Sequence, residues 1–251
     1  MKHSQVDGQV CLISGAGSGI GRATAIRFAE EGAMVAILDK DEHAAMETKE
    51  IVCAIGAKAA ALKADVSNDN QVAEAIARAE RELGPIDILF NNAGIACSGT
   101  VMETSDETLQ RLFSINVQSI FVVSRHVLPA MIDRRRGSII NTGSVSGMVG
   151  VERMSAYCAS KGAVIALTRA MAIDYAPYNI RINCVCPGLV ATDLVRREFG
   201  EDIRDRVLQK YPLGRIANPQ EVADLVLFLA GDKSGFITGA VMPIDGGMTA
   251  Q

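Results

Sequence analysis

The regular alternation of short apolar runs with longer helical segments restricts the fold of this chain more than any other feature of its sequence. Several of these runs are nearly continuous stretches of Val, Ile, Leu and Ala, which is typical of parallel strands that helices cover on both faces. The expected strands are Val10–Ile13, Met34–Leu38, Ala59–Leu62, Ile86–Phe90, Ser138–Asn141, Ile180–Val185 and Val241–Ile244.

Helical segments separate these strands and are expected at about 20–31, 42–55, 69–83, 106–133, 155–176 and 219–230. A strand, a helix and a second strand in succession form a right-handed crossover, and repeated crossovers make a parallel sheet with helices on both faces. The predicted fold is therefore α/β, a doubly wound sheet of seven parallel strands. The length of 251 residues suits a single domain over 1–251, and neither a linker nor a repeat divides it.

Only the residues from about 188 to 218 interrupt the alternation. This stretch contains no strand-like run, carries the charged residues Arg196, Arg197 and Glu198, and follows Pro187-Gly188. A long connection of this kind often covers a functional site. We therefore expect a helical, substrate-covering flap at about 188–218.

Composition and charge argue against several classes of protein. The net charge of −4 and the short basic run Arg134–Arg136 give no footprint for nucleic acid, so we expect no nucleic-acid partner. No run of about 18 apolar residues occurs, and residues Met1–Asp7 lack the apolar core of a signal peptide. We therefore expect no membrane association and a cytoplasmic location.

The six cysteines and three histidines indicate neither a disulfide framework nor a metal site. The cysteines are spread along the chain without a paired spacing. Cys184 and Cys186 lie in one strand-like run, where we expect their side chains to face opposite ways. The isolated histidines His3, His43 and His126 are interpreted as surface or packing residues.

A glycine-rich turn, Ser14–Gly21, follows the first expected strand and opens a helix. Glycines at this point permit a tight turn and let the backbone approach a pyrophosphate at the helix amino terminus. Asp39 ends the next strand, where a carboxylate accepts hydrogen bonds from an adenosine ribose diol and repels a 2′-phosphate. The pattern favours NAD over NADP, although Lys40 partly offsets the repulsion. The alternative interpretation of Asp39 is a cap of the following helix.

Tyr157 and Lys161 stand four residues apart in an expected helix and therefore share one face. A neighbouring ammonium favours the phenolate, so we expect Lys161 to lower the pKa of Tyr157 from about 10 toward working pH. Such a tyrosine can take the proton of an alcohol while a hydride leaves the carbon. The spacing alone is also typical of a solvated helix face.

Several motifs, in order, resemble the short-chain dehydrogenase/reductase family over nearly the whole chain. The matching positions are the glycine spacing of the first turn, Asp65-Val66, Asn91-Asn92-Ala93-Gly94, and Tyr157 with Lys161 after Ser144. Ser14 is a mild departure, since many members have Thr there. The resemblance implies a Rossmann fold and the catalytic set Asn116, Ser144, Tyr157 and Lys161.

Each member of this set has a physical task. Ser144 is expected to donate a hydrogen bond to the substrate oxygen beside the Tyr157 hydroxyl. Lys161 is expected to act on Tyr157 and also to hold the nicotinamide ribose. By resemblance, Asn116 bends its helix and holds a water that links Lys161 to solvent.

The resemblance also implies the residues that bind the cofactor, which is expected to be NAD. Pro187-Gly188 and the residues behind it are similar to the family's nicotinamide carboxamide site, and a plain strand-ending turn is the alternative. The expected cofactor-binding residues are Gly15, Ser18, Gly19, Ile20, Gly21, Asp39, Asp65, Val66, Asn92, Ala93, Gly94, Tyr157, Lys161, Pro187, Gly188, Val190 and Thr192.

The sequence constrains the substrate less. The expected substrate contacts are Ser144, Ser146, Val149, Met154, Tyr157 and Gly188. Further candidates to line the pocket are Val145, Met148, Leu189, Val195 and Phe199, with Arg153, Arg196 and Arg197 nearby. An apolar lining suits a cyclic or aliphatic secondary alcohol, whereas inward arginines would meet a carboxylate or phosphate. Exposed arginine is the favoured state.

The predicted function is the NAD-dependent interconversion of a small secondary alcohol, such as a polyol or cyclic alcohol, with its ketone. An NADPH-dependent 3-oxoacyl-[acyl-carrier-protein] reductase is the alternative, and Asp39 argues against it. A lower alternative is a non-catalytic dinucleotide-sensing module, which the intact catalytic set disfavours. The helices at 106–133, 155–176 and 222–229 and the last strand resemble the surfaces that pair in the family's tetramers, so we expect a homotetramer.

Overall fold

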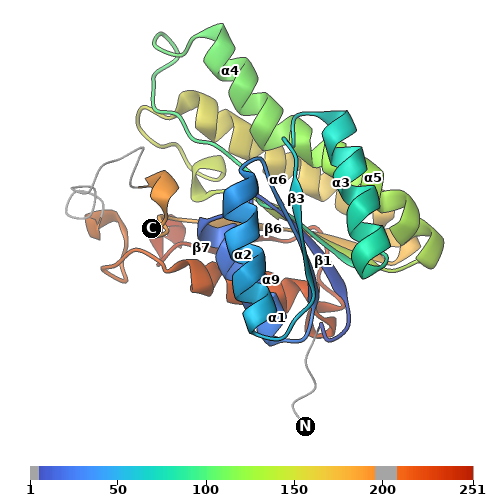
Figure 1. Ribbon diagram of the computed structural model, residues 1–251. Helices are drawn as coiled ribbons and strands as arrows, with labels where there is room; N and C mark the ends of the chain where they lie inside the picture. The colour runs from blue at the N-terminus through green and yellow to red at the C-terminus, as the bar shows by residue number, and fades with distance from the viewer. Residues whose placement is uncertain (1–5, 196–207, 251) are drawn as a thin grey trace.

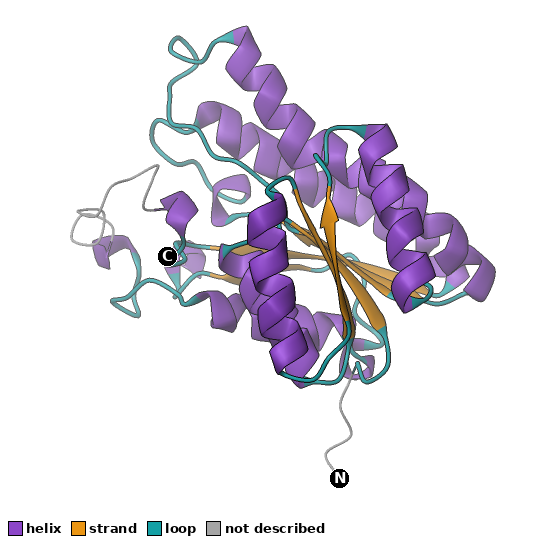
Figure 2. Cartoon of the chain, in the orientation of Figure 1, coloured by secondary structure: helices purple, strands orange, loops and turns teal. Residues whose placement is uncertain are grey.

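The computed structural model describes residues 6–195 and 208–250. These residues form a seven-stranded parallel sheet with helices on both faces (Figure 1, Figure 2). The strand order is β3-β2-β1-β4-β5-β6-β7, so the direction of the crossovers reverses between β1 and β4. The predicted doubly wound α/β fold is confirmed.

All neighbouring strands pair in parallel. The strands are β1 Val10–Ser14, β2 Met34–Asp39, β3 Ala59–Lys63, β4 Ile88–Asn91, β5 Gly137–Thr142, β6 Ile180–Pro187 and β7 Val241–Ile244. The expected strand beginning at Ile86 starts two residues later in the structure. Ile86 is fully buried, but its carbonyl accepts a hydrogen bond from the side chain of Arg134 (2.6 Å) instead of from a neighbouring strand.

The helices form two layers, each with its own hydrophobic core. Helices α1, α2 and α9 pack on one face of the sheet, and α3, α5 and α6 pack on the other (Figure 1). The helices are α1 Gly19–Glu30, α2 Glu42–Ala54, α3 Asp69–Leu83, α4 Asp106–Phe113, α5 Ser119–Arg134, α6 Ser155–Tyr175 and α9 Pro219–Ala230.

The single helix expected at 106–133 is divided in the structure. A π-helical turn, Ser114–Gln118, separates α4 from α5. Such a turn widens the helix by one residue and is frequent at functional sites. Asn116 lies in it, and its carboxamide accepts a hydrogen bond from the backbone N–H of Ile95 (2.9 Å) and donates one to the Ile95 carbonyl (3.0 Å). The predicted bend at Asn116 therefore takes the form of this local widening.

One helical stretch among the described residues, Asp106–Arg134, is long and apolar enough to pass a composition test for membrane spans. Half of its most apolar window is buried inside the protein. The buried side chains of α5 face the sheet beside those of α3 and α6, as in a core helix. The apolar character of this stretch is thus explained by packing.

Candidate active site

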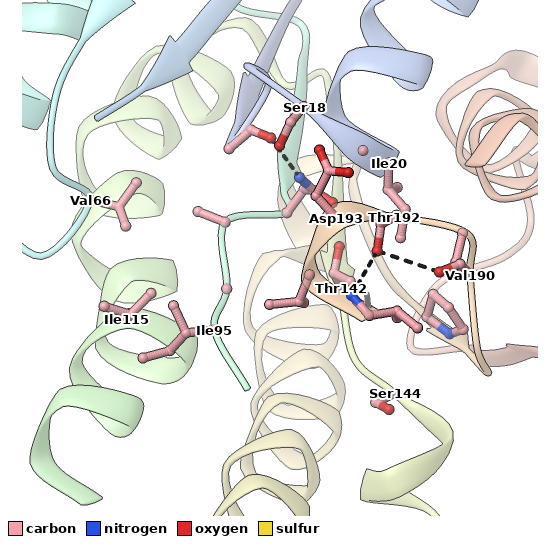
Figure 3. A pocket seen from close by; sticks show the side chains of 18 of the residues that line it. Ser18, Ile20, Val66, Ile95, Ile115, Thr142, Ser144, Val190, Thr192 and Asp193 are labelled. Atoms are coloured by element: carbon pink, nitrogen blue, oxygen red, sulfur yellow. Dashed lines mark hydrogen bonds between the residues drawn. The ribbon is translucent and has the colours of Figure 1, made fainter. Parts of the chain in front are cut away.

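A cavity of about 420 Å³ opens at the carboxyl ends of the central strands (Figure 3). Ligands of doubly wound folds bind at this edge, where the crossover direction reverses, and the reversal here lies between β1 and β4. The predicted site residues that line the cavity are Gly15, Ser18, Gly19, Ile20, Asp39, Asp65, Val66, Asn92, Ala93, Gly94, Ser144, Tyr157, Lys161, Pro187, Gly188, Val190 and Thr192.

The turn between β1 and α1 forms one wall of the cavity. Gly15 and Gly19 have φ angles of 64° and 52°, in the left-handed region that favours glycine. A Cβ on Gly15 would lie 2.9 Å from Cα of Ala93, so the turn touches the end of β4 backbone to backbone. The Ser14 hydroxyl accepts hydrogen bonds from the backbone N–H groups of Asn92 (3.0 Å) and Ala93 (3.1 Å). This hydroxyl, which Thr would also supply, joins the two strand ends.

Gly21 is a predicted cofactor contact that does not line the cavity. A Cβ at this position would collide with the carbonyl oxygen of Gly15 and lie 2.8 Å from Cα of Ala16 and from Nδ2 of Asn92. Nδ2 of Asn92 itself donates hydrogen bonds to the carbonyls of Ser14 (3.0 Å) and Gly15 (3.1 Å). Gly21 lets α1 approach the turn closely, which is a packing role.

Asp39, at the end of β2, lines the cavity beside the glycine-rich turn. Its Oδ2 accepts a hydrogen bond from the backbone N–H of Gly17 (2.8 Å), and its Oδ1 accepts one from that of Asp41 (3.0 Å). Asp41 is the residue that caps α2, with its Oδ1 accepting from Ala44 N (3.2 Å). The alternative interpretation of Asp39 as the helix cap is therefore wrong. Both oxygens of Asp39 keep lone pairs for further donors.

Asp65 lies just beyond β3 and its Oδ1 accepts hydrogen bonds from the N–H (2.9 Å) and hydroxyl (2.6 Å) of Ser67. These bonds lower the pKa of Asp65 against the opposing effect of burial, and the charges of Lys40 and Arg111 lower it further. Lys40 and Arg111 also line the cavity, so this end contains positive as well as negative charge.

Tyr157 and Lys161 lie on one face of α6 and both line the cavity, as their spacing predicts. Lys161 is 4% exposed, its Nζ lies 5.8 Å from the centre of the Tyr157 ring, and it donates a hydrogen bond to the carbonyl of Thr142 (2.8 Å). The loop after β5 packs directly on this helix, because a Cβ on Gly147 would lie 2.6 Å from the Lys161 carbonyl carbon. This close contact brings Ser144 to the Tyr157 hydroxyl.

Burial dominates the electrostatics of this pair. Removal from water raises the pKa of Tyr157 to about 12, although a hydrogen bond with the Ser144 side chain opposes the rise. Removal from water also lowers the pKa of Lys161 to about 8, against the smaller opposing effects of Cys184 and Cys186. The expectation that Lys161 lowers the pKa of Tyr157 toward working pH is therefore wrong, since desolvation dominates and Lys161, at 5.8 Å from the ring centre, is not among the groups that lower this pKa.

Asn116 does not line the cavity but lies behind it, 2% exposed. In addition to its two bonds with Ile95, it donates a hydrogen bond to the Ser160 hydroxyl (3.1 Å), which donates in turn to the Tyr157 carbonyl (2.8 Å). A Cβ on Gly94 would lie 3.3 Å from Oδ1 of Asn116 and 3.6 Å from Nζ of Lys161. Asn116 thus joins the chain after β4 to the helix that carries Tyr157.

The segment after β6 forms a further wall of the cavity and meets the glycine-rich turn, since a Cβ on Gly19 would lie 3.2 Å from Cγ2 of Thr192. Pro187, Gly188, Val190 and Thr192 line the cavity, and the Thr192 hydroxyl donates to the carbonyl of Val190 (3.4 Å) (Figure 3). The segment pairs with the far end of the expected flap through a bridge between Val190 and Ala217. Residues 196–207 of the flap, with Arg196, Arg197 and Phe199, lie outside the described residues.

Three predicted substrate contacts, Ser146, Val149 and Met154, are not among the lining residues. Ser146 and Met154 are buried in the packing of the 145–154 segment, and Val149 is exposed. Val145, Met148 and Leu189 do not line the cavity either, whereas Val195 does. Arg153 turns outward and pairs with Glu103 (2.9 Å), in agreement with the favoured exposed state.

The prediction omitted several lining residues: Ala64, Ile95, Arg111, Ile115, Thr142, Gly143, Asp193 and Leu194. Some of these could have been found from their neighbours, since Thr142 and Gly143 immediately precede Ser144 at a strand end. Arg111 and Ile115 lie one helical turn apart and share a face. Only the tertiary packing of α4 and the following π-helical turn against α6 shows that this face reaches the cavity.

Cys184 and Cys186 lie on one side of β6, with their sulfur atoms 3.8 Å apart. The expectation that they face opposite ways is wrong, because residues i and i+2 of a strand share a face. Gly143 lies directly over both, since a Cβ there would be 2.7 Å from each sulfur. The two thiols thus support the backbone between Thr142 and Ser144.

The residues of the cavity fit a dinucleotide. Gly15 and Gly19 expose the backbone of this turn to the cavity with no Cβ in between, as a pyrophosphate site requires. Asp39 offers carboxylate oxygens at one end, and Tyr157 with Lys161 stands at the other. Thr142 Oγ1 is the one buried side-chain oxygen or nitrogen in the described ranges that lacks a hydrogen-bond partner, and its residue lines the cavity. A ligand hydroxyl would satisfy it.

Comparison with known proteins gives the family. A family model described as "Enoyl-(Acyl carrier protein) reductase" matches residues 15–249. The chain is similar to "Inactive 2-(S)-hydroxypropyl-CoM dehydrogenase 2" of Xanthobacter autotrophicus (47% identical, covering 87% of this chain and 96% of that protein). It is also similar to "2-(S)-hydroxypropyl-CoM dehydrogenase 3" of the same organism (40%, covering 98% and 99%). A further relative is "Meso-2,3-butanediol dehydrogenase" of Serratia marcescens (41%, covering 98% and 96%).

A solved structure agrees with these relatives. A short-chain type dehydrogenase/reductase from Mycobacterium marinum superposes with a TM-score of 0.95 at 36% identity, covering 99% of this chain and 98% of that one. The chain belongs to the short-chain dehydrogenase/reductase family. It is an oxidoreductase of CH–OH groups, in a family that uses nicotinamide dinucleotides.

The buried Lys161 makes a testable contribution to the pH dependence of stability. Its pKa of about 8 in the folded protein lies below its ordinary 10.5, so between these values the unfolded chain holds a proton that the folded chain has released. Stability attributable to Lys161 therefore rises with pH across this window. We expect the unfolding free energy of wild type minus that of Lys161→Met to rise by about 1 kcal/mol per pH unit from about pH 8 to about pH 9.5.

Chemical denaturation over this range checks the prediction, and the exposed Lys58→Met is the matched control, for which the difference stays flat. The measurement stops below pH 10 because the unfolded lysine itself loses its proton near 10.5, so the difference levels off above that point. A flat difference for Lys161→Met would show that burial does not disfavour the protonated form of Lys161.

Proposed function

We propose that this protein is an NAD-dependent dehydrogenase that interconverts a small secondary alcohol and its ketone, with Tyr157 as the acid/base. The observation that supports this most directly is the convergence of Ser144, Tyr157 and Lys161 on the cavity that also holds the glycine-rich turn and Asp39. One cavity therefore combines a site for proton transfer with a site that fits a dinucleotide.

When bound, the dinucleotide would supply the acceptor or donor of the hydride. Tyr157 would hold or release the proton of the substrate oxygen, and Ser144, already hydrogen-bonded with it, would orient that oxygen. Lys161, anchored on the Thr142 carbonyl, keeps donors for a ribose hydroxyl. With a pKa of about 12, Tyr157 is protonated near neutral pH, and it would become a base only where added positive charge favours its phenolate.

We assign the cofactor contacts by position along the cavity. Asp39, Asp65 and Val66 would hold the adenosine, and the turn at Gly15, Ser18, Gly19 and Ile20 the pyrophosphate. Asn92, Ala93 and Gly94 would contact the middle of the cofactor, and Pro187, Gly188, Val190 and Thr192 its nicotinamide. Asn116 would act from behind as a positioning residue, and we propose that it takes part in the proton exit from Lys161.

Two alternatives are less well supported. A relative named "3-oxoacyl-[acyl-carrier-protein] reductase FabG" of Thermotoga maritima favours the 3-oxoacyl reductase, but the negative charge of Asp39 beside the glycine-rich turn disfavours the NADPH that this alternative would use. The name of one relative contains "Inactive", which favours a non-catalytic module. In this chain Asn116, Ser144, Tyr157 and Lys161 are all present and connected, which favours an active enzyme.

Removal of the Tyr157 hydroxyl tests the proposed reaction. Tyr157→Phe keeps the ring and loses the proton, so we expect kcat to fall by about 10²- to 10⁴-fold with little change in cofactor binding. The assay follows NAD reduction with meso-2,3-butanediol, cyclohexanol and 2-(S)-hydroxypropyl-CoM as substrates. The exposed Tyr178→Phe is the matched control, with unchanged turnover expected. Full turnover of Tyr157→Phe on a substrate that the wild type accepts would refute the assignment.

Asp39 is expected to set the cofactor preference. Wild type should bind NADH more tightly than NADPH, and Asp39→Asn should narrow the difference by about tenfold, because the amide no longer repels a 2′-phosphate but keeps the shape of the carboxylate. Fluorescence titration with both reduced cofactors at one ionic strength measures this. Asp41→Asn is the control, since that carboxylate only caps α2. Tighter binding of NADPH by wild type would favour the acyl-carrier-protein reductase instead.

Assembly as a homotetramer is also proposed. Large apolar side chains are exposed on the elements that the sequence singles out: Phe121 on α5 (50%), Ile173 on α6 (76%) and Phe236 beside β7 (104%). Sedimentation should give a tetramer, and a Phe121→Asp/Ile173→Asp double variant should give a smaller species, because a charge in an apolar interface costs several kcal/mol. A wild-type monomer at working concentration would contradict the proposal.

A further inference from the structure

Tyr211 is a buried tyrosine with no part in the proton transfer proposed above. It follows the 3-10 turn Leu208–Lys210 and is 5% exposed, whereas Gln209, Lys210 and residues 212–215 around it are all exposed. A large aromatic side chain that is buried alone in an exposed segment anchors that segment to the body of the protein. The surface that Tyr211 contacts therefore shows what the anchor holds.

The Tyr211 side chain packs on the segment that follows β6. Its hydroxyl accepts a hydrogen bond from the backbone N–H of Leu189 (3.0 Å). A Cβ on Gly188 would lie 2.8 Å from Cε1 of the Tyr211 ring, so the glycine provides the space for the ring. The ring and the hydroxyl thus both contact the Gly188–Leu189 peptide.

Backbone hydrogen bonds hold the other groups of this segment. Gly188 N donates to the carbonyl of Ile244 (3.1 Å), Ala191 N donates to Ala217 O (2.9 Å), and Ala217 N donates to Leu189 O (2.9 Å). The Leu189 N–H differs from these groups, because it donates to a side chain, the Tyr211 hydroxyl. Loss of this acceptor would leave a half-buried donor unpaired and free the peptide next to Gly188.

This peptide borders the reaction end of the cavity. Thr142, next to Gly143 and Ser144, pairs in register with Val185, so Pro187 and Gly188 continue past the strand end beside Ser144. Pro187, Gly188 and Val190 line the cavity there. A nicotinamide ring that exchanges a hydride with a carbon beside Tyr157 must lie against this wall.

We propose that Tyr211 is a positioning residue that holds the Gly188–Val190 segment in the form that binds the nicotinamide half of the cofactor. The proposal rests on the function proposed above. Tyr211 does not touch the cavity itself, and it acts through the Leu189 N–H and the Gly188 backbone. The adenosine half of the cofactor, bound at Asp39 and Asp65, is independent of it.

Binding of two ligands that differ in the nicotinamide tests the role of Tyr211. Calorimetric titrations with NADH and with ADP-ribose, which lacks that ring, are compared for wild type and Tyr211→Phe. We expect the Kd for NADH to rise about fivefold in the variant, because one hydrogen bond is lost and its donor left unpaired, while the Kd for ADP-ribose stays within about twofold. Tyr175→Phe, a tyrosine packed against the core, is the matched control and should change neither value.

Gly188→Ala provides a second variant, since the added methyl group would meet the Tyr211 ring and Cα of Asp245, and it should show the same selective loss of NADH affinity. Because Gly188 itself lines the cavity, the result for Tyr211→Phe decides the role of Tyr211. Melting curves establish that each variant is folded. Equal weakening of both ligands, or no weakening of NADH, in Tyr211→Phe would overturn the positioning role while wild type still binds both. A wild type that binds neither ligand would overturn the proposed function itself, and this inference with it.

Discussion

The contact between the β1–α1 turn and the end of β4 is the constraint on which the site depends. Gly15 meets Ala93 backbone to backbone, and the Ser14 hydroxyl and the Asn92 side chain fasten the two strand ends together. Because these strands flank the point where the crossovers reverse, the contact defines the floor of the crevice between the two helical layers. The parallel register of the sheet then places the ends of β2, β5 and β6 around this crevice. The packing of Gly147 on Lys161 adds α6 to it.

A second constraint is the burial of ionisable groups at the reaction end. The polar groups there are supported from behind by backbone contacts, with Gly147 against α6 and Gly143 against the two thiols of β6. Burial keeps Tyr157 protonated and makes Lys161 an amine that titrates near pH 8. Tyr157 is thus a proton donor whose pKa positive charge in the cavity would lower.

Much of the fold could be predicted from the sequence because the relevant signals are local. Nearly continuous apolar runs, the helical segments between them and the glycines of the first turn are each recognised within a few residues of sequence. Two errors were local as well. Ile86 is as apolar as a strand residue, but its carbonyl accepts a hydrogen bond from the Arg134 side chain and not from a neighbouring strand. The shared face of Cys184 and Cys186 follows from strand geometry alone, because residues i and i+2 lie on the same side.

The site residues were predictable where a motif stands at a strand end, as for Gly15, Asp39, Ser144 and Tyr157. They were not predictable where the position depends on contacts between elements remote in the sequence. Gly21 was expected to touch the cofactor but packs against Gly15, and Ser146 and Met154 are buried in their own segment. Arg111 reaches the cavity only because α4 packs against α6, which carries Tyr157 and Lys161.

By itself the sequence determined the strand and helix order, the family resemblance and the residue types of the reaction, since each follows from local pattern. The tertiary structure decided the pKa values of Tyr157 and Lys161, the division of the 106–133 helix at Asn116 and the anchoring of Leu189 by Tyr211. Desolvation and contacts across elements depend on which surfaces meet, and no local pattern records that.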